Sequence, residues 1–124
     1  MSSDSPAADG APRDAAPLTL ADYQRAAART LNRSLTPNER LLDAAAGLAE
    51  EAGEVLGLVR KHLFMRHDLD RARLLIELGD ALWCLTAIAG ALDLTLEDAA
   101  AANLEKLRRR YPEGYSDEAS RSAR

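Results

Sequence analysis

Apolar residues recur along this chain at alternating steps of three and four, which is the spacing of one face of an α-helix. Two central segments carry the longest rows. The rows are Leu41, Ala45, Leu48, Ala52, Val55 and Val59 in the first segment, and Leu75, Leu78, Leu82, Leu85, Ala89 and Leu92 in the second. Aromatic residues make up only 4% of the chain, and abundant Ala and Leu favour helix over strand. We therefore expect an all-α protein.

Polar residues mark where these helices begin and end. Thr36-Pro37-Asn38-Glu39 combines a capping Thr, a Pro in the first turn and a Glu that reaches back to the cap. The expected helices cover residues 20–31, 37–64 and 69–91, the third capped by Asp68, and a fourth starts at Thr95–Asp98 and ends near Arg110. Short links make successive helices antiparallel, so the predicted architecture is a four-helix bundle.

The ends of the chain differ in composition from its middle. Residues 1–17 are rich in Ser, Ala, Asp, Gly and Pro and predict a disordered tail. Residues 18–116 are expected to form one helical domain, and residues 117–124 a flexible C-terminal tail. The segment 69–91 carries further apolar residues outside its row: Leu74, Ile76, Trp83 and Ile88. A helix that is apolar on so many sides is enclosed or faces a second subunit, so we expect an oligomer.

Charge and cysteine content exclude several classes of function. The formal net charge of −4 argues against binding to a nucleic-acid polymer, because such binders are usually basic. Cys84 is the single cysteine, which excludes an intrachain disulfide and a cysteine-cluster zinc site. No apolar run approaches ~18 residues, so no membrane span is expected and the cytoplasm is the expected location.

Two pairs of acidic residues carry the candidate chemistry. Glu51 and Glu54 are one helical turn apart, and so are Glu77 and Asp80. Both pairs lie at similar distances from the expected link at residues 65–68, so antiparallel packing places them together. Facing carboxylates repel each other unless a cation neutralises them, and oxygen ligands select Mg²⁺ or Mn²⁺. Neither pair has the Glu-x-x-His pattern of a di-iron bundle.

The ordered set of segments resembles the MazG-like family of all-α nucleoside triphosphate pyrophosphohydrolases. The family motif is Glu-x-x-Glu, a gap, then Glu-x-x-Asp, and here 22 residues (55–76) separate the pairs. The segments that carry the resemblance are Ala49-Glu-Glu-Ala-Gly-Glu-Val55, Lys61-His-Leu-Phe64, Glu77-Leu-Gly-Asp-Ala-Leu-Trp83 and Asn103-Leu-Glu-Lys-Leu-Arg-Arg-Arg-Tyr-Pro112. The resemblance covers roughly residues 19–120.

The resemblance implies an activity and a metal centre. Family members form dimers or tetramers of helical bundles and cleave nucleoside triphosphates to monophosphate and pyrophosphate with Mg²⁺. Carried onto this chain, the metal ligands are Glu51, Glu54, Glu77 and Asp80. Glu51 and Glu54 are the catalytic candidates, with Glu51 or Glu50 as the acceptor of the water's proton.

Basic and amide side chains are the candidates for substrate binding. Asn103, Lys106 and Arg110 are three and four residues apart and share one helix face, which suits contacts with phosphate or sugar. Lys61 lies two turns after Glu54 and is a further phosphate-binding candidate. Three alternatives stay open at this point: a base-selective dUTP or dCTP pyrophosphatase, a non-catalytic nucleotide-binding helical module, and a purely structural bundle.

Overall fold

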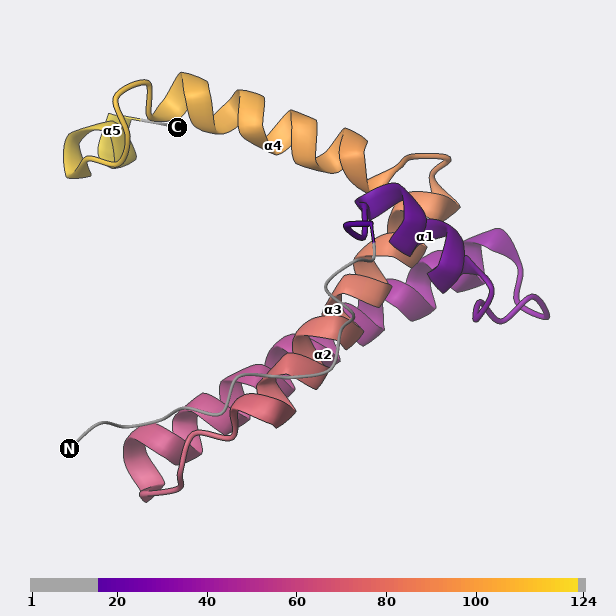
Figure 1. Ribbon diagram of the computed structural model, residues 1–124, viewed down its shortest axis with the longest axis horizontal. Helices are drawn as coiled ribbons and strands as arrows, with labels where there is room; N and C mark the ends of the chain where they lie inside the picture. The colour runs from indigo at the N-terminus through magenta and orange to yellow at the C-terminus, as the bar shows by residue number, and fades with distance from the viewer. Residues whose placement is uncertain (1–15, 123–124) are drawn as a thin grey trace.

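The computed structural model describes residues 16–122, and all of the regular secondary structure in this range is helical (Figure 1). The helices are α1 (Leu20–Ala28), α2 (Pro37–Met65), α3 (Arg71–Ala91), α4 (Leu96–Arg110) and α5 (Asp117–Ser122). No strand occurs among the described residues, and the all-α prediction is confirmed. Residues 1–15, most of the predicted N-terminal tail, lie outside the described part of the chain.

The helices α2 and α3 form a long antiparallel hairpin, and they lie side by side along most of its length (Figure 1). A tight turn closes the hairpin. Arg66 adopts the left-handed conformation with φ 57°, and the backbone N–H of His67 donates to the carbonyl of Lys61 at 3.2 Å. The ring Nδ1 of His62 lies 2.8 Å from the carbonyl oxygen of His67. This turn sets the register in which the side chains of α2 meet those of α3.

Most helix starts follow the predicted capping residues. The Oγ1 of Thr36 accepts from the N–H of Glu39 at 3.2 Å, and Thr95 and Asp98 form a reciprocal capping box. The third start differs from the prediction. The closing turn uses the residues that follow α2, so α3 begins at Arg71, and its cap is Asp70 rather than Asp68.

A short helix, α5, covers most of the segment 117–124 that was expected to be a flexible C-terminal tail. Its first turn is held locally, because the Oγ of Ser116 accepts from the N–H of Ala119 at 3.0 Å. At the other end of the chain, α1 ends at Ala28, three residues before the predicted boundary at Leu31. The α1 difference falls at the end of a helix, where few contacts decide whether a turn is helical.

The helices α1 and α4 meet at the end of α3 farthest from the hairpin turn (Figure 1). Gln24 of α1 joins them. Its Nε2 donates to the carbonyl of Leu94 at 3.1 Å, and its Oε1 accepts from the N–H of Leu96 at 2.9 Å. Beyond this junction α4 runs away from the hairpin, and residues 101–109 are all exposed. The helix α4 therefore depends on its first turn for contacts within this chain.

The interior of the chain is built mainly from small residues. The buried apolar residues are Ala44, Cys84, Ala87, Ala89 and Leu96. Small side chains allow close approach of α2 and α3, and a Cβ added at Gly47 would lie 3.0 Å from the Sγ of Cys84. The larger residues of the α3 row point outward instead, with Leu75 71% and Leu78 58% exposed. Much of the apolar surface of α3 is thus uncovered in the single chain.

Among the described residues, α3 is the helix whose length and composition would allow it to cross a membrane. It carries Glu77 and Asp80 near its middle, and charged groups at such a depth in lipid are costly. It also packs against α2 along the hairpin. We therefore interpret α3 as a packing helix of the fold, not as a membrane span.

Replacement of Gln24 by Ala is expected to lower the free energy of unfolding by about 1–3 kcal/mol, because two hydrogen bonds that join α1 to the α3–α4 link are lost. Urea unfolding at one fixed protein concentration measures the change. Arg25→Ala is the control, because it removes only the exposed ion pair with Asp22 and should lower the free energy of unfolding much less. Equal effects of the two substitutions would contradict the bridging role.

Candidate metal centre

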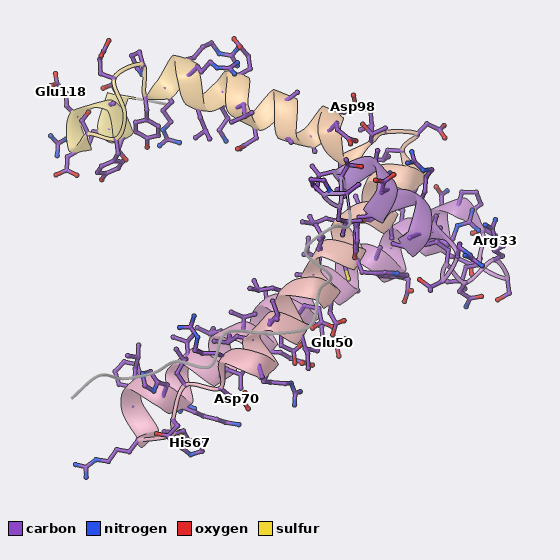
Figure 2. All side chains as sticks on the ribbon, in the orientation of Figure 1. Arg33, Glu50, His67, Asp70, Asp98 and Glu118 are labelled. Atoms are coloured by element: carbon purple, nitrogen blue, oxygen red, sulfur yellow. The ribbon has the colours of Figure 1, made fainter. Side chains whose placement is uncertain are left out.

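Three carboxylates meet between α2 and α3, near the middle of the hairpin. One oxygen from each of Glu51, Glu77 and Asp80 lies within 4.8 Å of the others. Glu77 and Asp80 share a face of α3 because they are one turn apart, and the hairpin turn brings Glu51 of α2 to the same depth. Figure 2 marks this level by Glu50, the neighbour of Glu51 on α2. We refer to Glu51, Glu54, Glu77 and Asp80 together as the acidic cluster.

Glu54 lies at the edge of this cluster and outside the group of three. It contacts Glu77, and this contact is the first cause of an increase in the pKa of the Glu54 carboxyl. Its Oε2 also lies 3.7 Å from a guanidinium nitrogen of Arg73. The structure therefore brings all four predicted acids into one neighbourhood, but only three of them are placed at the mutual distances that suit one ion.

Arg73 is a residue of the site that sequence reasoning missed. Its Nε donates to Oε1 of Glu77 at 2.5 Å, so it forms an ion pair across one turn of α3 while it also faces Glu54 of α2. The spacing of four residues between Arg73 and Glu77 was a usable signal. It was overlooked because Arg73 lies outside the paired-acid motif.

Burial and crowding shift the pKa values of these carboxyls. The side chain of Glu77 is only 3% exposed, and the hydrogen bond from Arg73 holds its pKa below the ordinary value. The contact with Glu77 is the main reason that the pKa of Glu51 rises to about 7, with burial and the other acids adding to it. Proton binding at Glu51 thus relieves the repulsion among these carboxyls.

The donor set fits a hard divalent cation. Every candidate ligand is a carboxylate oxygen, which Mg²⁺ and Mn²⁺ prefer. The Oε2 of Glu51 is buried and accepts no hydrogen bond among the described residues. A buried carboxylate oxygen without a donor is costly, and a bound cation would satisfy it.

An open pocket of about 380 Å³ adjoins the acidic cluster. Its lining consists of Asp43, Gly47, Glu51, Asp80, Trp83 and Cys84. The indole ring of Trp83 is held in place, because its Nε1 donates to Oγ1 of Thr30 at 2.7 Å. Gly47 lets α2 approach the Sγ of Cys84 at this point of the wall, since a Cβ there would lie 3.0 Å from that sulfur. The pocket therefore offers carboxylates at one side and an aromatic face at another.

The residues predicted to bind substrate do not join the acids within one chain. Asn103, Lys106 and Arg110 lie on α4, which leads away from the hairpin (Figure 1), and none of them lines the pocket. Arg110 instead donates to the carbonyl of Ser120 at 3.3 Å. Lys61 is exposed near the hairpin turn and does not line the pocket either. Their predicted role thus requires surfaces that a single chain does not bring together.

Comparison with known protein families gives one match. The family model of the MazG nucleotide pyrophosphohydrolase domain matches residues 40–115, more than half of the chain. The matched region contains the whole acidic cluster, all of α3 and α4, and the pocket wall at Gly47 and Trp83. No curated protein and no solved structure matches this chain.

Metal binding is expected to strengthen as pH rises toward 7. The pKa of Glu51 is raised to about 7, so below that pH its carboxyl holds a proton that a cation must displace. The apparent Mg²⁺ dissociation constant should fall by up to about 10-fold per pH unit between pH 5 and 7 and level off above it. Isothermal titration calorimetry in buffers of different ionisation enthalpy measures both the affinity and the protons released.

The variant Glu51→Gln removes this titrating group and should flatten the pH dependence while weakening binding. Glu97→Gln, an exposed substitution on the first turn of α4, should retain the pH dependence of Mg²⁺ binding. A wild-type affinity that does not change between pH 5 and 7 would contradict the assignment of Glu51.

Proposed function

Because the chain belongs to the MazG family of nucleotide pyrophosphohydrolases, we propose that it hydrolyses nucleoside triphosphates to monophosphate and pyrophosphate with Mg²⁺. The observation that carries this proposal is the convergence of Glu51, Glu77 and Asp80 within 4.8 Å, beside a pocket large enough for part of a nucleotide. The acidic pocket would repel a triphosphate in the absence of a cation, so the substrate and the metal must bind together.

The acidic cluster would hold the metal, with Glu51, Glu77 and Asp80 as the central ligands and Glu54 at the edge. When bound, Mg²⁺ supplies charge neutralisation at the phosphates and lowers the pKa of a water molecule. Glu51 is the proposed acceptor of the water's proton, through its carboxylate oxygen not used in coordination, and its neighbour Glu50 is the second candidate. The new bond joins the water oxygen to the α-phosphorus, and the bond from that phosphorus to the bridging oxygen breaks to release pyrophosphate.

The pocket wall at Trp83 and Gly47 is the proposed position of the nucleoside. A fixed indole ring suits stacking with a base. This arrangement is compatible with a general nucleoside triphosphatase and with the alternative of a dUTP- or dCTP-selective enzyme. The other alternative is a module that binds nucleotide without cleaving it.

A homodimer or homotetramer is the proposed working form, located in the cytoplasm. Leu75, Leu78 and Leu85 form an exposed apolar row on α3, and rows of this kind mark contact surfaces. A second copy would cover the row. It would also allow Asn103, Lys106 and Arg110 of one copy to approach the acidic cluster of another, which their own chain does not permit.

Hydrolysis should produce monophosphate and pyrophosphate only when Mg²⁺ is present, and Glu77→Gln should lower turnover by roughly 100-fold or more, because the metal loses a buried charged ligand. Chromatographic product analysis with all NTPs and dNTPs, with Mg²⁺ or with a chelator, tests this and ranks the bases. Glu97→Gln serves as the exposed control and should retain turnover. Tight nucleotide binding without products from any substrate would favour the non-catalytic module.

The paired substitution Leu75→Lys and Leu78→Lys should shift the protein to monomers and strongly reduce turnover, because charges on the α3 row oppose its burial by a second copy. Light scattering after size-exclusion chromatography measures the mass. Leu18→Lys, at a residue 75% exposed and outside α3, should leave the mass unchanged. A wild-type protein that is monomeric at micromolar concentration would refute the oligomer.

A further inference from the structure

Arg73 occupies an unusual position relative to the acidic cluster. It lies in the first turn of α3, and its guanidinium reaches both Glu77 on its own helix and Glu54 on α2. Among the ion pairs of the described residues, it is the one cation paired with any acid of the cluster. Lys61, Asn103, Lys106 and Arg110, the residues expected to meet phosphate, lie elsewhere in the chain.

We propose that Arg73 is a displaceable counter-cation of the metal centre, which pairs with Glu77 and Glu54 when the metal is absent and turns to the substrate phosphates when the metal is bound. This inference rests on the proposed function, because it requires a divalent cation at the acidic cluster. It adds a positioning residue that the paired-acid motif does not contain.

The burial of the three side chains supports displacement. Glu77 is 3% exposed, whereas the side chain of Arg73 is 56% exposed. The carboxylate is therefore fixed in the packed hairpin, and the guanidinium approaches it from the solvent side. Arg73 can leave without unpacking either helix. Its contact with Glu54, at 3.7 Å, is already loose.

Charge also supports the displacement of Arg73 by a metal ion. Arg73 brings a single positive charge to Glu77 and Glu54, whereas a divalent cation at the three central acids would bring two. The Nε–Oε1 hydrogen bond of 2.5 Å occupies one oxygen of Glu77, the carboxylate that both arrangements share. Because the metal and the guanidinium are both attracted by the negative charge of Glu77, a bound metal would weaken the ion pair with Arg73.

The geometry of arginine suits the proposed contact with the substrate phosphates. Its planar fork of donors matches two phosphate oxygens, and it stays charged at every physiological pH. Arg73 stands at the solvent-facing rim of the cluster, one turn from Glu77 and outside the lining of the pocket, so phosphates that extend past the metal ligands would meet it there. Once released from Glu77 and Glu54, its long stem allows the head to meet phosphates at that rim.

The test measures Mn²⁺ binding to the intact protein by electron paramagnetic resonance, so it does not depend on turnover. Arg73→Gln should bind Mn²⁺ about 5- to 10-fold more tightly than the wild type, because the competing charge is gone. Arg73→Lys should fall between the two, since a lysine head keeps the charge but not the fork. Arg71→Gln, two residues away in the same first turn, is the control and should match the wild type. Circular dichroism verifies folding.

A second measurement addresses the phosphates. With saturating Mn²⁺, Arg73→Gln should bind a non-hydrolysable α,β-imido nucleotide about 10-fold or more weakly, whereas Arg71→Gln should not. Unchanged or weaker Mn²⁺ binding by folded Arg73→Gln would overturn the competition, and unchanged analogue binding would overturn the phosphate contact. Absence of Mn²⁺ binding by the wild type would instead refute the proposed function itself, and this inference with it.

Discussion

Mutual repulsion among carboxylates at one level of the α2–α3 hairpin is the constraint on which the other features of the site depend. Glu77 is almost fully buried, and Glu51 and Glu54 both face it from the opposite helix. The cluster reduces its charge in two ways, by the ion pair with Arg73 and by the raised pKa of Glu51. A fold that retains such a cluster at the centre of its longest helix pair gains stability when a cation binds there.

Local signals in the sequence were sufficient for much of this fold. The caps at Thr36 and Thr95 and the helix periods are set by neighbours within four residues, so the helix types and most boundaries followed from them. Antiparallel packing alone placed the two acid pairs at one depth. The Asp70 cap was missed, because the turn geometry after α2 decides where α3 begins, and no residue pattern in the sequence predicts that geometry.

Long-range arrangement was the part that the sequence did not show. The shared face of Asn103, Lys106 and Arg110 is a property of α4 alone, but the direction of α4 is set at its junction with α1 through Gln24. That junction depends on contacts 70 or more residues apart. The same reasoning explains the α3 row: the period showed that Leu75 and Leu78 share a face, but not that small residues would occupy the interface with α2.

The hydrogen bond from Trp83 to Thr30 links a short peripheral segment to the wall of the pocket. Thr30 follows α1, a helix of nine residues without a buried side chain, so this region can open at far lower free energy than the α2–α3 hairpin. When α1 frays, the indole loses its anchor while the carboxylates keep their places. In the proposed function, regions of unequal local stability would thereby support recognition of the base and retention of the metal. Heating would then impair selectivity among nucleotides before it impaired the capacity to bind a cation.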